Sequence, residues 1–523
     1  MLKSQDLTSV SGGRHLWSQR IVMVRTGDRV ELGGTGVHSW RNNHPRVVLD
    51  EQSDGVGLAW LHQEKVLPHN DRQILPPHVE PRRKPLSMLQ SVRAARRNVL
   101  EIIPAIAYQQ PIVSGRMGGA RWHMVQDPAS LRRIYLDNAA NYPKSEVMLR
   151  MLRPAIGNSL FTAEGAEWRW QRRAVAPVFA QRNVTALAPV MTATAERASQ
   201  RLQAAAPNAE MVAEMLTATF DVICEVALSG REHFDAKVYG AAITRYFETA
   251  GKASLLDFLR VPSWFPRPGE LLGYGAVHTM HEMVAKAIDA RRAQATGKAD
   301  DLLDFMLKAT DPETGRTMSA HDVLHNMQFF IVAGHETTAL ALSWALQLLA
   351  LYPEIQEEAH AEARSVLGDQ PASLDHLENM PLGRRILEES MRLYPPVGML
   401  AREVLANDQL GGRDIHTNDV IFLPLYALHR HATLWDSPNT FNPDRFLPEQ
   451  VKARDRYAYL PFGAGPRVCV GANFAMMQAQ IILGTLLSRF RFAPGPHALP
   501  HPTMLMTVRP DTGINLRVTS RQL

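Results

Sequence analysis

The feature of this sequence that most constrains its fold is one very long helical segment. The helical pattern runs from Ser319 to Leu351. Ser319, or Thr317 before it, can cap the start, and Pro353 stops the helix after Tyr352. At 1.5 Å per residue such a helix is about 50 Å long, which is enough to cross a whole domain. The segment therefore predicts a helical fold built around it.

The remaining pattern is also mainly helical. Apolar residues recur at three- and four-residue spacing in the segments 87–107, 191–206, 211–228 and 270–292. Strand-like pieces are short and lie at 111–114, 121–125 and 419–423. The expected fold class is therefore mainly α with a minor β region.

The centre of the long helix is weak and polar. Residues 333–338 read Ala-Gly-His-Glu-Thr-Thr. A glycine inside a helix costs about 1 kcal/mol relative to alanine, and a threonine side chain can bond to the carbonyl four residues before it and bend the helix. These residues alone leave two interpretations open: a tolerated kink, or a pocket against which another group packs.

Composition narrows the classes of function. The 523 residues are 45% apolar and 21% charged, which is typical of globular proteins and excludes a mainly disordered chain. Two cysteines are too few for a disulfide-stapled scaffold, an iron–sulfur cluster held by this chain alone, or a four-cysteine zinc module. A net charge of +5 is mild for this length. It is compatible with an acidic partner, and no nucleic-acid partner is expected.

Residues 1–75 differ from the rest of the chain. They are rich in glycine, histidine, serine and charged residues, show no clear helical period, and precede a proline- and arginine-rich segment at 76–85. We expect 1–75 to be a poorly structured N-terminal extension, with a small regulatory module as the alternative. Residues 76–523 are expected to form one large domain.

No segment is predicted to span a membrane. A spanning helix needs about 20 mostly apolar residues, and the most apolar long stretch, 338–352, carries Ser343 and Gln347. The first 30 residues lack the basic, apolar and small-residue order of a signal peptide. We therefore expect a soluble, cytoplasmic protein without an integral membrane segment.

A glycine-rich loop presents one of the two cysteines. Residues 462–471 read Phe-Gly-Ala-Gly-Pro-Arg-Val-Cys-Val-Gly and lead into an apolar helical segment at 472–487. Cys469 thus lies at a helix N-terminus, and both this position and Arg467 favour its thiolate form. Cys224, inside an apolar helical segment, is expected to be a buried small hydrophobic residue.

The cysteine loop resembles the haem-binding signature of the cytochrome P-450 family, the haem-thiolate monooxygenases. The family pattern Phe-x-x-Gly-x-Arg-x-Cys-x-Gly is met at Phe462, Gly465, Arg467, Cys469 and Gly471. A chance match in a chain of this length is on the order of 10⁻⁴. The resemblance extends, with further motifs in the family's order, over roughly residues 80–520. It implies that the domain at 76–523 is a single cytochrome P-450 catalytic domain.

The resemblance implies a haem b group whose iron is ligated by Cys469. Thiolate donation favours O–O cleavage, and Phe462 would limit solvent on the thiolate side. Glu389 and Arg392 look like the family's Glu-x-x-Arg pair. With Arg445 in the segment 443–446 they would form a buried triad that braces the loop.

Four further residues are implied to hold the two haem propionates. Trp168 and Arg172 look like the family's Trp-x-x-x-Arg motif, and Arg402 follows a Leu-Tyr-Pro-Pro segment where the family places another arginine. Together with Arg467 they would offset the propionate charges through charge-assisted hydrogen bonds.

The polar centre of the long helix is similar to the family's oxygen-activation motif. The resemblance implies that Thr337 positions oxygen and a water, that Glu336 supplies protons from solvent, and that Gly334 leaves room beside the oxygen. His335 is a rival for metal ligation, but this position commonly faces away from the iron in the family.

The implied reaction is insertion of one atom of O₂ into a small apolar molecule. Since no dinucleotide-binding motif is found and the cysteines are too few for an iron–sulfur domain, the electrons are expected from a separate ferredoxin or flavodoxin with its reductase. Two alternatives are a haem-binding sensor or carrier without turnover, and a peroxide-driven oxidant.

The expected pocket walls are all apolar, and they suggest an apolar substrate, with fatty acids and other lipids favoured by analogy. The wall candidates are Leu160, Phe161, Phe329, Phe330, Ala333, Val397, Met399 and Leu400. The segment 255–265, with Trp264 and Phe265, is a candidate for a lid over the access channel.

Overall fold

The computed structural model describes residues 75–84, 86–117, 120–227, 234–250, 261, 265, 268–293 and 302–521, and two strands near the N-terminus. The chain divides into two units, Met1–Arg72 and Gln73–Leu523. In the first unit, β1 (Val22–Thr26) pairs antiparallel with β2 (Arg29–Gly33). Apart from these strands and Leu75, the predicted extension at 1–75 lies outside the described residues.

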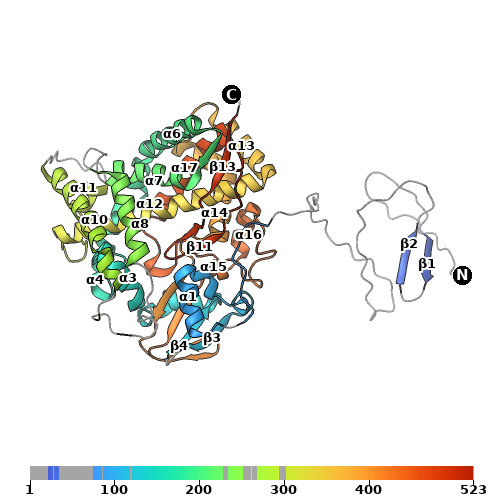
Figure 1. Ribbon diagram of the computed structural model, residues 1–523, viewed down its shortest axis with the longest axis horizontal. Helices are drawn as coiled ribbons and strands as arrows, with labels where there is room; N and C mark the ends of the chain where they lie inside the picture. The colour runs from blue at the N-terminus through green and yellow to red at the C-terminus, as the bar shows by residue number, and fades with distance from the viewer. Residues whose placement is uncertain are drawn as a thin grey trace. The chain divides into compact units, whose positions relative to one another are not determined.

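The long helix predicted from the sequence is α12 (Ala320–Leu351), and it forms the axis of the second unit (Figure 1). Ser319 caps it, because its hydroxyl oxygen accepts the backbone N–H of Asp322 while the Asp322 carboxylate accepts the N–H of Ser319. Pro353 begins the next helix, α13 (Pro353–Leu367). The predicted helix and its cap are therefore confirmed.

The C-terminal half of α12 is core. Every residue from Thr338 to Leu351 is buried, against α7 (Met211–Ala227), α14 (Pro381–Leu393) and α17 (Ala472–Arg489). Within the described part of the chain, α12 is the one helix long and apolar enough to cross a membrane, and 61% of its apolar window is buried inside the fold. Its apolar surface serves packing in this structure.

The other predicted helices are found with small shifts at their ends. The segments 191–206, 211–228 and 270–292 lie in α6 (Ala188–Ala205), α7 and α10 (Pro268–Ala293). Further helices are α2 (Pro128–Arg132), α3 (Glu146–Ile156), α4 (Gly165–Val175), α5 (Gln181–Ala186), α8 (Ala236–Thr249), α11 (Leu302–Leu307), α15 (Leu425–Leu428) and α16 (Pro448–Ala453). Short turns of helix are η3 (Arg133–Asp137), η4 (Ala139–Asn141), η5 (Ala176–Phe179), η6 (Leu374–Asn379), η7 (Pro443–Phe446), η8 (Arg456–Ala458) and η9 (Gly465–Arg467).

The helix predicted over 87–107 is wrong in its second half. α1 (Met88–Arg97) ends at Asn98, whose backbone is extended and whose side-chain oxygen accepts the N–H of Leu100. Two short turns follow, η1 (Val99–Ile102) and η2 (Ala105–Tyr108), separated by Pro104. An asparagine that caps a new turn competes with the helix it follows, and a proline excludes helical backbone in the residue before it.

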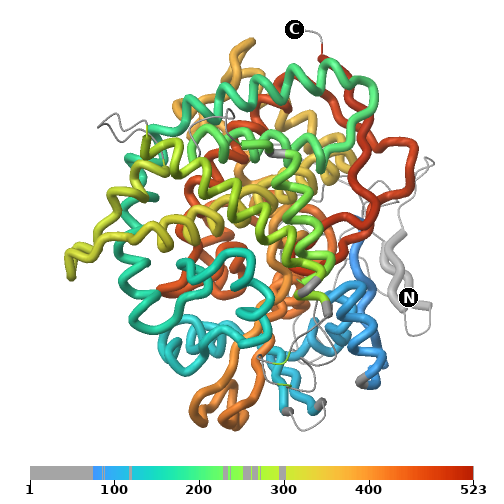
Figure 2. Tube along the Cα trace, turned by 60° about the vertical axis from the view of Figure 1, so that its left-hand side comes forward, coloured from blue at the N-terminus to red at the C-terminus, as the bar shows by residue number. Residues whose placement is uncertain are grey.

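The main sheet has four strands in the order β3 (Ile112–Met117), β4 (Ala120–Val125), β9 (Val420–Leu423) and β6 (Leu400–Glu403). β4 pairs parallel with β9, and the other pairs are antiparallel. Figures 1 and 2 show these N-terminal (blue) and later (orange) segments together at one end of the unit. The sheet places β6, and with it Arg402, beside the helical core.

Smaller sheets join distant segments. One has the order β10 (Phe490–Pro494), β13 (Asn515–Ser520) and β5 (Asn208–Glu210), and two are the hairpins β7 (Asp408–Leu410) with β8 (Arg413–Ile415) and β11 (Pro502–Met504) with β12 (Val508–Pro510). The apolar core is large on the helical side and smaller under the main sheet. Cys224 lies in the larger core, as predicted.

Candidate active site

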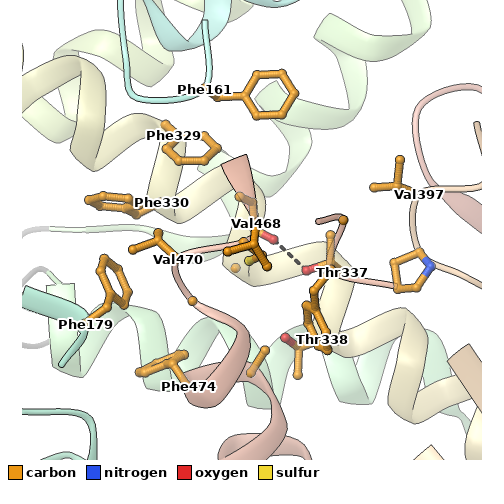
Figure 3. A pocket seen from close by; sticks show the side chains of 18 of the residues that line it. Phe161, Phe179, Phe329, Phe330, Thr337, Thr338, Val397, Val468, Val470 and Phe474 are labelled. Carbon is orange, nitrogen blue, oxygen red and sulfur yellow. Dashed lines mark hydrogen bonds between the residues drawn. The ribbon is translucent and has the colours of Figure 1, made fainter. Parts of the chain in front are cut away.

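A cavity of about 310 Å³ lies between α12 and the cysteine loop. Its lining comes from α4, α7, α12, α17, β6 and the loop itself. Figure 3 shows phenylalanine rings on one side of this cavity and Thr337 and Val468 facing its interior. Gly334, Thr337 and Cys469, which the sequence motifs singled out separately, all line this one space.

The cysteine loop depends on its glycines. Gly463 and Gly465 have φ angles of +71° and +65°, a region that side chains other than glycine rarely adopt. A side chain at Gly465 would also overlap the backbone carbonyl of Tyr135. The N–H of Cys469 donates to the carbonyl of Phe462 at 2.9 Å. The loop thus closes on itself and presents the thiol to the cavity.

The environment of the Cys469 thiol differs from the expectation based on sequence. Burial raises its pKa, while the backbone N–H of Gly471 and the guanidinium of Arg172 act in the opposite direction. The cation that acts on the thiol is Arg172 of α4. Arg467, expected in that role, forms an ion pair with Glu164 instead.

Two arginines at the cavity, Arg402 buried and Arg172 half-buried, form no ion pair with a described residue. Arg402 is 7% exposed, and its printed hydrogen bond is from Nη1 to the carbonyl of Ala401 at 3.2 Å. Arg172 also lines the cavity. Neither forms an ion pair within the described part of the chain, and burial lowers the pKa of both. Glu164 acts on Arg402 only through space. A cation withdrawn from solvent without an ion-pair partner is unfavourable, so these two groups favour an anionic occupant.

Lys144 is a cavity residue that the sequence analysis missed. Its Nζ lies 3.2 Å from Glu164 Oε1, and burial, with Arg467 nearby, lowers its pKa to about 7. Arg467 donates to the carbonyl of Ala163 at 3.0 Å and stacks over the ring of Trp168 at 4.3 Å. Lys144 belongs to no motif, and only its neighbourhood in the fold identifies it.

The α12 side of the cavity carries one hydroxyl in a defined orientation. Thr337 Oγ1 donates to the carbonyl of Ala333 at 2.7 Å, the dashed line in Figure 3. This is the back-bond that bends helices. Gly334 also lines the cavity, and a side chain there would press on Ile223 of α7 at 3.0 Å.

Glu336 and His335 do not line the cavity. Glu336 Oε1 accepts a hydrogen bond from Arg509 Nη2 at 2.5 Å. The ring of His335 packs edge-on against Phe220 at 5.0 Å, and burial lowers its pKa to about 4. Consecutive residues on a helix face different directions, so the motif spans the cavity face and two other faces of α12.

Most of the expected apolar walls line the cavity, with one exception. Leu160, Phe161, Phe329, Phe330, Ala333, Val397 and Leu400 all contribute. Met399 does not: it is buried in the core because adjacent residues of an extended segment point to opposite sides. Apolar lining that the sequence did not predict comes mainly from Phe179, Ile223, Val226, Leu302, Phe305 and Phe474. The predicted lid at 255–265, including Trp264, lies outside the described residues except for 261 and 265.

Glu389, Arg392 and Arg445 come together behind the cysteine loop. Glu389 and Arg392 have fully buried side chains, and Arg392 Nε and Nη2 donate to the two carboxylate oxygens at 2.6 and 2.7 Å. Arg445 Nε lies 3.4 Å from Glu389 Oε1. Arg392 also donates to the carbonyl of His429, whose ring nitrogen accepts the N–H of Leu460 just before the loop. The buried pair is thereby connected to the chain segment that carries Cys469.

Comparison with known proteins assigns the fold and the class of protein. The chain belongs to the cytochrome P450 family, whose model matches residues 81–518. Cyclooctatin synthase of Streptomyces melanosporofaciens is 29% identical over 79% of this chain and 90% of that protein. Taurochenodeoxycholic 6 alpha-hydroxylase of Sus scrofa is 30% identical over 76% and 81%. The solved cytochrome P450DA heme domain has a TM-score of 0.72 at 24% identity and covers 86% of this chain and 99% of its own.

A further relative, cyclooctat-9-en-7-ol 5-monooxygenase of Streptomyces melanosporofaciens, is 28% identical over 78% of this chain and 88% of that protein. The family membership and the relatives named as a monooxygenase and a hydroxylase make this protein a cytochrome P450 monooxygenase. The predicted mainly α P-450 fold is confirmed. Members of this family hold haem through a cysteine thiolate. The residues of this cavity fit that group: it offers a thiol, apolar walls, and two guanidiniums that could pair with two propionates, Arg402 buried and Arg172 half-buried.

Proposed function

We propose that this protein inserts one atom of O₂ into an apolar, lipid-like substrate, with haem b held by Cys469. The cavity carries the proposal. It brings a thiol, a threonine hydroxyl and two guanidiniums that form no ion pair with a described residue into one apolar space. An apolar pocket with a few convergent polar groups is the usual form of a small-molecule site.

The residues would divide the binding of haem as follows. Cys469 Sγ would ligate the haem iron, and Phe462, which also lines the cavity, would limit solvent near the thiolate. Arg172 and Arg402 would pair with the propionates, because neither guanidinium forms an ion pair with a described residue. Arg467 would share that role from its place over Trp168, and Lys144 extends the same positive edge. When bound, the haem supplies oxygen activation.

On the α12 side, this chain's own groups hold and move protons. Thr337 Oγ1 faces the cavity and keeps its lone pairs free to accept while it donates to Ala333. Glu336, one residue earlier, has a partly exposed carboxylate and can exchange protons with solvent. We propose that Glu336 delivers protons to the cavity by way of Thr337 and ordered water, which requires its carboxylate to leave Arg509.

The substrate is proposed to be an apolar, lipid-like molecule, with fatty acids and other lipids favoured. All four cations of the lining are assigned to the propionate edge, and the other lining side chains are apolar apart from a few neutral polar ones. The relatives named above act, by their names, on cyclooctatin-type and taurochenodeoxycholic compounds.

We further propose that a separate ferredoxin or flavodoxin, with its reductase, supplies the electrons. The chain's two cysteines cannot hold an iron–sulfur cluster, and its net charge of +5 suits an acidic donor.

We also propose that residues 1–75 form an extension and residues 76–523 the catalytic domain. The composition of residues 1–75 and a family match that begins at residue 81 support this division. The cytoplasmic location stays a prediction.

The test is a titration of the purified ferric protein with dodecanoic acid, a sesquiterpene alcohol and a steroid, followed by optical spectroscopy and by turnover with O₂ and a reductase system. A saturable spin-state shift and a product carrying one oxygen atom from O₂ would support the proposal. Full haem content without turnover would favour the sensor or carrier alternative. Turnover with peroxide alone would favour the peroxide-driven oxidant. A protein that binds no haem would overturn the assignment of Cys469.

A further inference from the structure

The short loop between α3 and α4 carries two cavity residues, Leu160 and Phe161. Two of its backbone amides are held by side chains of α12. The N–H of Leu160 donates to Asn326 Oδ1 at 2.8 Å, and the N–H of Asn158 donates to His325 Nδ1 at 3.2 Å. A loop held by side-chain acceptors at two of its amides has little freedom to shift.

Two fully buried amides complete this arrangement. Asn326 and Gln171 are both 0% exposed. Gln171 Nε2 donates to the carbonyl of Asn158 at 3.1 Å, and Asn326 Nδ2 donates to Gln171 Oε1 at 3.2 Å. Asn326 Nδ2 also donates to the carbonyl of Asp322. Below, His325, Asn326 and Gln171 are called the loop clamp.

The loop is also tightly fitted to the clamp. Gly157 has a φ angle of +56°, and any side chain there would overlap the ring of His325. Inside the loop, Thr162 Oγ1 donates to the carbonyl of Gly157 and accepts the N–H of Ser159. The turn therefore keeps its own shape and is fixed as one piece by the clamp.

The protonation state of His325 suits this role. Burial and the neighbouring rings of His321 and His281 lower its pKa, against a smaller opposite effect of Asp322. The ring therefore stays neutral near pH 7, and Nδ1 remains an acceptor for the N–H of Asn158.

Phe161 transmits the position of the loop to the cavity. Its ring lies 5.7 Å from the ring of Phe329, and both face the cavity in Figure 3. Oxidation of a C–H bond is sensitive to placement of the reacting carbon on the scale of 1 Å. Any shift of the 157–163 loop moves Phe161 against the substrate.

We propose that Asn326, supported by Gln171 and His325, is a specificity-determining positioning residue that holds Phe161 and so determines which carbon of the substrate is oxidised. The inference rests on the proposed function, because it needs a substrate oxidised in this cavity. None of the three clamp residues belongs to the motifs that identify the family.

The first test examines the loop clamp by a measurement that does not depend on enzyme activity. Amide hydrogen exchange is compared for wild type, Asn326→Leu and a matched control, Asn98→Leu. Asn98 is also buried and accepts backbone N–H groups, but outside the cavity. We expect at least tenfold faster exchange in the 157–163 segment for Asn326→Leu only. Unchanged exchange in that segment would overturn the clamp.

The second test measures the ratio of oxidised isomers formed from dodecanoic acid. Asn326→Leu should change the ratio at least threefold, and Asn98→Leu should not. In a Phe161→Ala background, Asn326→Leu should add no further change, because the clamp acts through that ring. An additive effect, or an unchanged ratio in the single variant, would overturn the positioning role.

The same samples distinguish failure of the proposed function from failure of this inference alone. A wild-type protein that binds haem but oxidises no probe would overturn the proposed function and this inference with it. A wild type with product isomers whose ratio does not respond to the clamp would overturn this inference alone. If the Asn326→Leu protein does not retain haem, the Gln171→Met variant is used in its place. Gln171→Met keeps the hydrogen bond between Asn326 and Leu160 and removes the one between Gln171 and Asn158.

Discussion

Glu336 and Arg509 form an ion pair between the middle of α12 and strand β12, with 2.5 Å between Arg509 Nη2 and Glu336 Oε1. The carboxylate does not line the cavity, whereas Ala333, Gly334, Thr337 and Thr338 of the same motif do. Proton delivery by Glu336 therefore involves breaking or lengthening a specific contact with a residue 173 positions away.

The first prediction concerns this pair. Glu336→Gln should lower coupled product formation by roughly 10²-fold, the usual contribution of a general acid. Arg509→Gln keeps the carboxylate and removes its partner, so it should change coupled turnover by less than about threefold. Product formed per O₂ consumed and the solvent isotope effect are the measurements. An equal loss in both variants would show that the ion pair, and not the carboxylate alone, is required.

The second prediction concerns the hydroxyl that faces the cavity. Thr337→Ala should leave haem content unchanged and uncouple oxygen consumption from product, with peroxide released and coupling lowered roughly tenfold. Thr338→Ala is the matched control, because Thr338 also lines the cavity. The measurement is the ratio of product to peroxide. If Thr337→Ala stays fully coupled, the proposed role of Thr337 is wrong.

The third prediction concerns the unpaired charge of Arg402. Arg402→Leu removes a buried cation that forms no ion pair with a described residue, so the haem-free protein should gain stability. The same change should speed haem loss about 10- to 100-fold, as expected for a hydrogen bond to a charged group worth about 1.5–3 kcal/mol. The two measurements are the Tm of the haem-free protein and the rate of haem transfer to a scavenger protein.

The matched control for this pair of effects is Arg169→Leu, which changes an arginine on α4 that does not line the cavity. Arg169→Leu should change neither the Tm of the haem-free protein nor the rate of haem transfer. If the haem-free Arg402→Leu protein has a lower Tm than the haem-free wild type, then Arg402 is a structural residue and not a propionate partner.

The fourth prediction concerns acid. Burial lowers the pKa of His335 to about 4 and that of His429 to about 3, from an ordinary value of 6.5. The unfolded chain binds more protons than the folded one below pH 6.5, so the free energy of unfolding falls as pH falls, until the folded-state pKa values are passed. For His335 the total loss is about 3 kcal/mol.

Denaturant unfolding at pH 7, 5.5 and 4.5 checks this dependence. His335→Phe, which can pack against Phe220, should make the pH dependence shallower by up to one proton. The same slope in the variant would contradict the assignment to this ring.

Residues whose role depends on near neighbours in the chain can be predicted from the sequence. The Ser319 cap and the apolar period are local, so α12 is predicted nearly to the residue. The loop around Cys469 needs glycine at positive φ and a close backbone approach at Gly465. These positions are therefore restricted to glycine, and the loop can be recognised from the sequence. The pair Glu389 and Arg392 is found because its two members are one helical turn apart.

Residues brought in from distant segments were missed or assigned a different neighbour. Lys144 and Asn326 carry no local signal, and their contacts with Glu164 and Leu160 exist only after folding. Arg467 was expected beside the thiol, but packing gave that place to Arg172. Met399 was expected in the pocket and lies in the core, because an apolar residue satisfies either place.

The amino-acid sequence by itself determined the class of fold, the long central helix and the glycine-rich loop that carries Cys469, because these follow from periodicity, capping and backbone freedom within a few residues. The tertiary structure alone decided which charges are left unpaired at the cavity, where Glu336 points, and which buried amides hold Phe161. Those outcomes depend on burial and on hydrogen bonds between helices far apart in the chain, and no spacing within one segment specifies them.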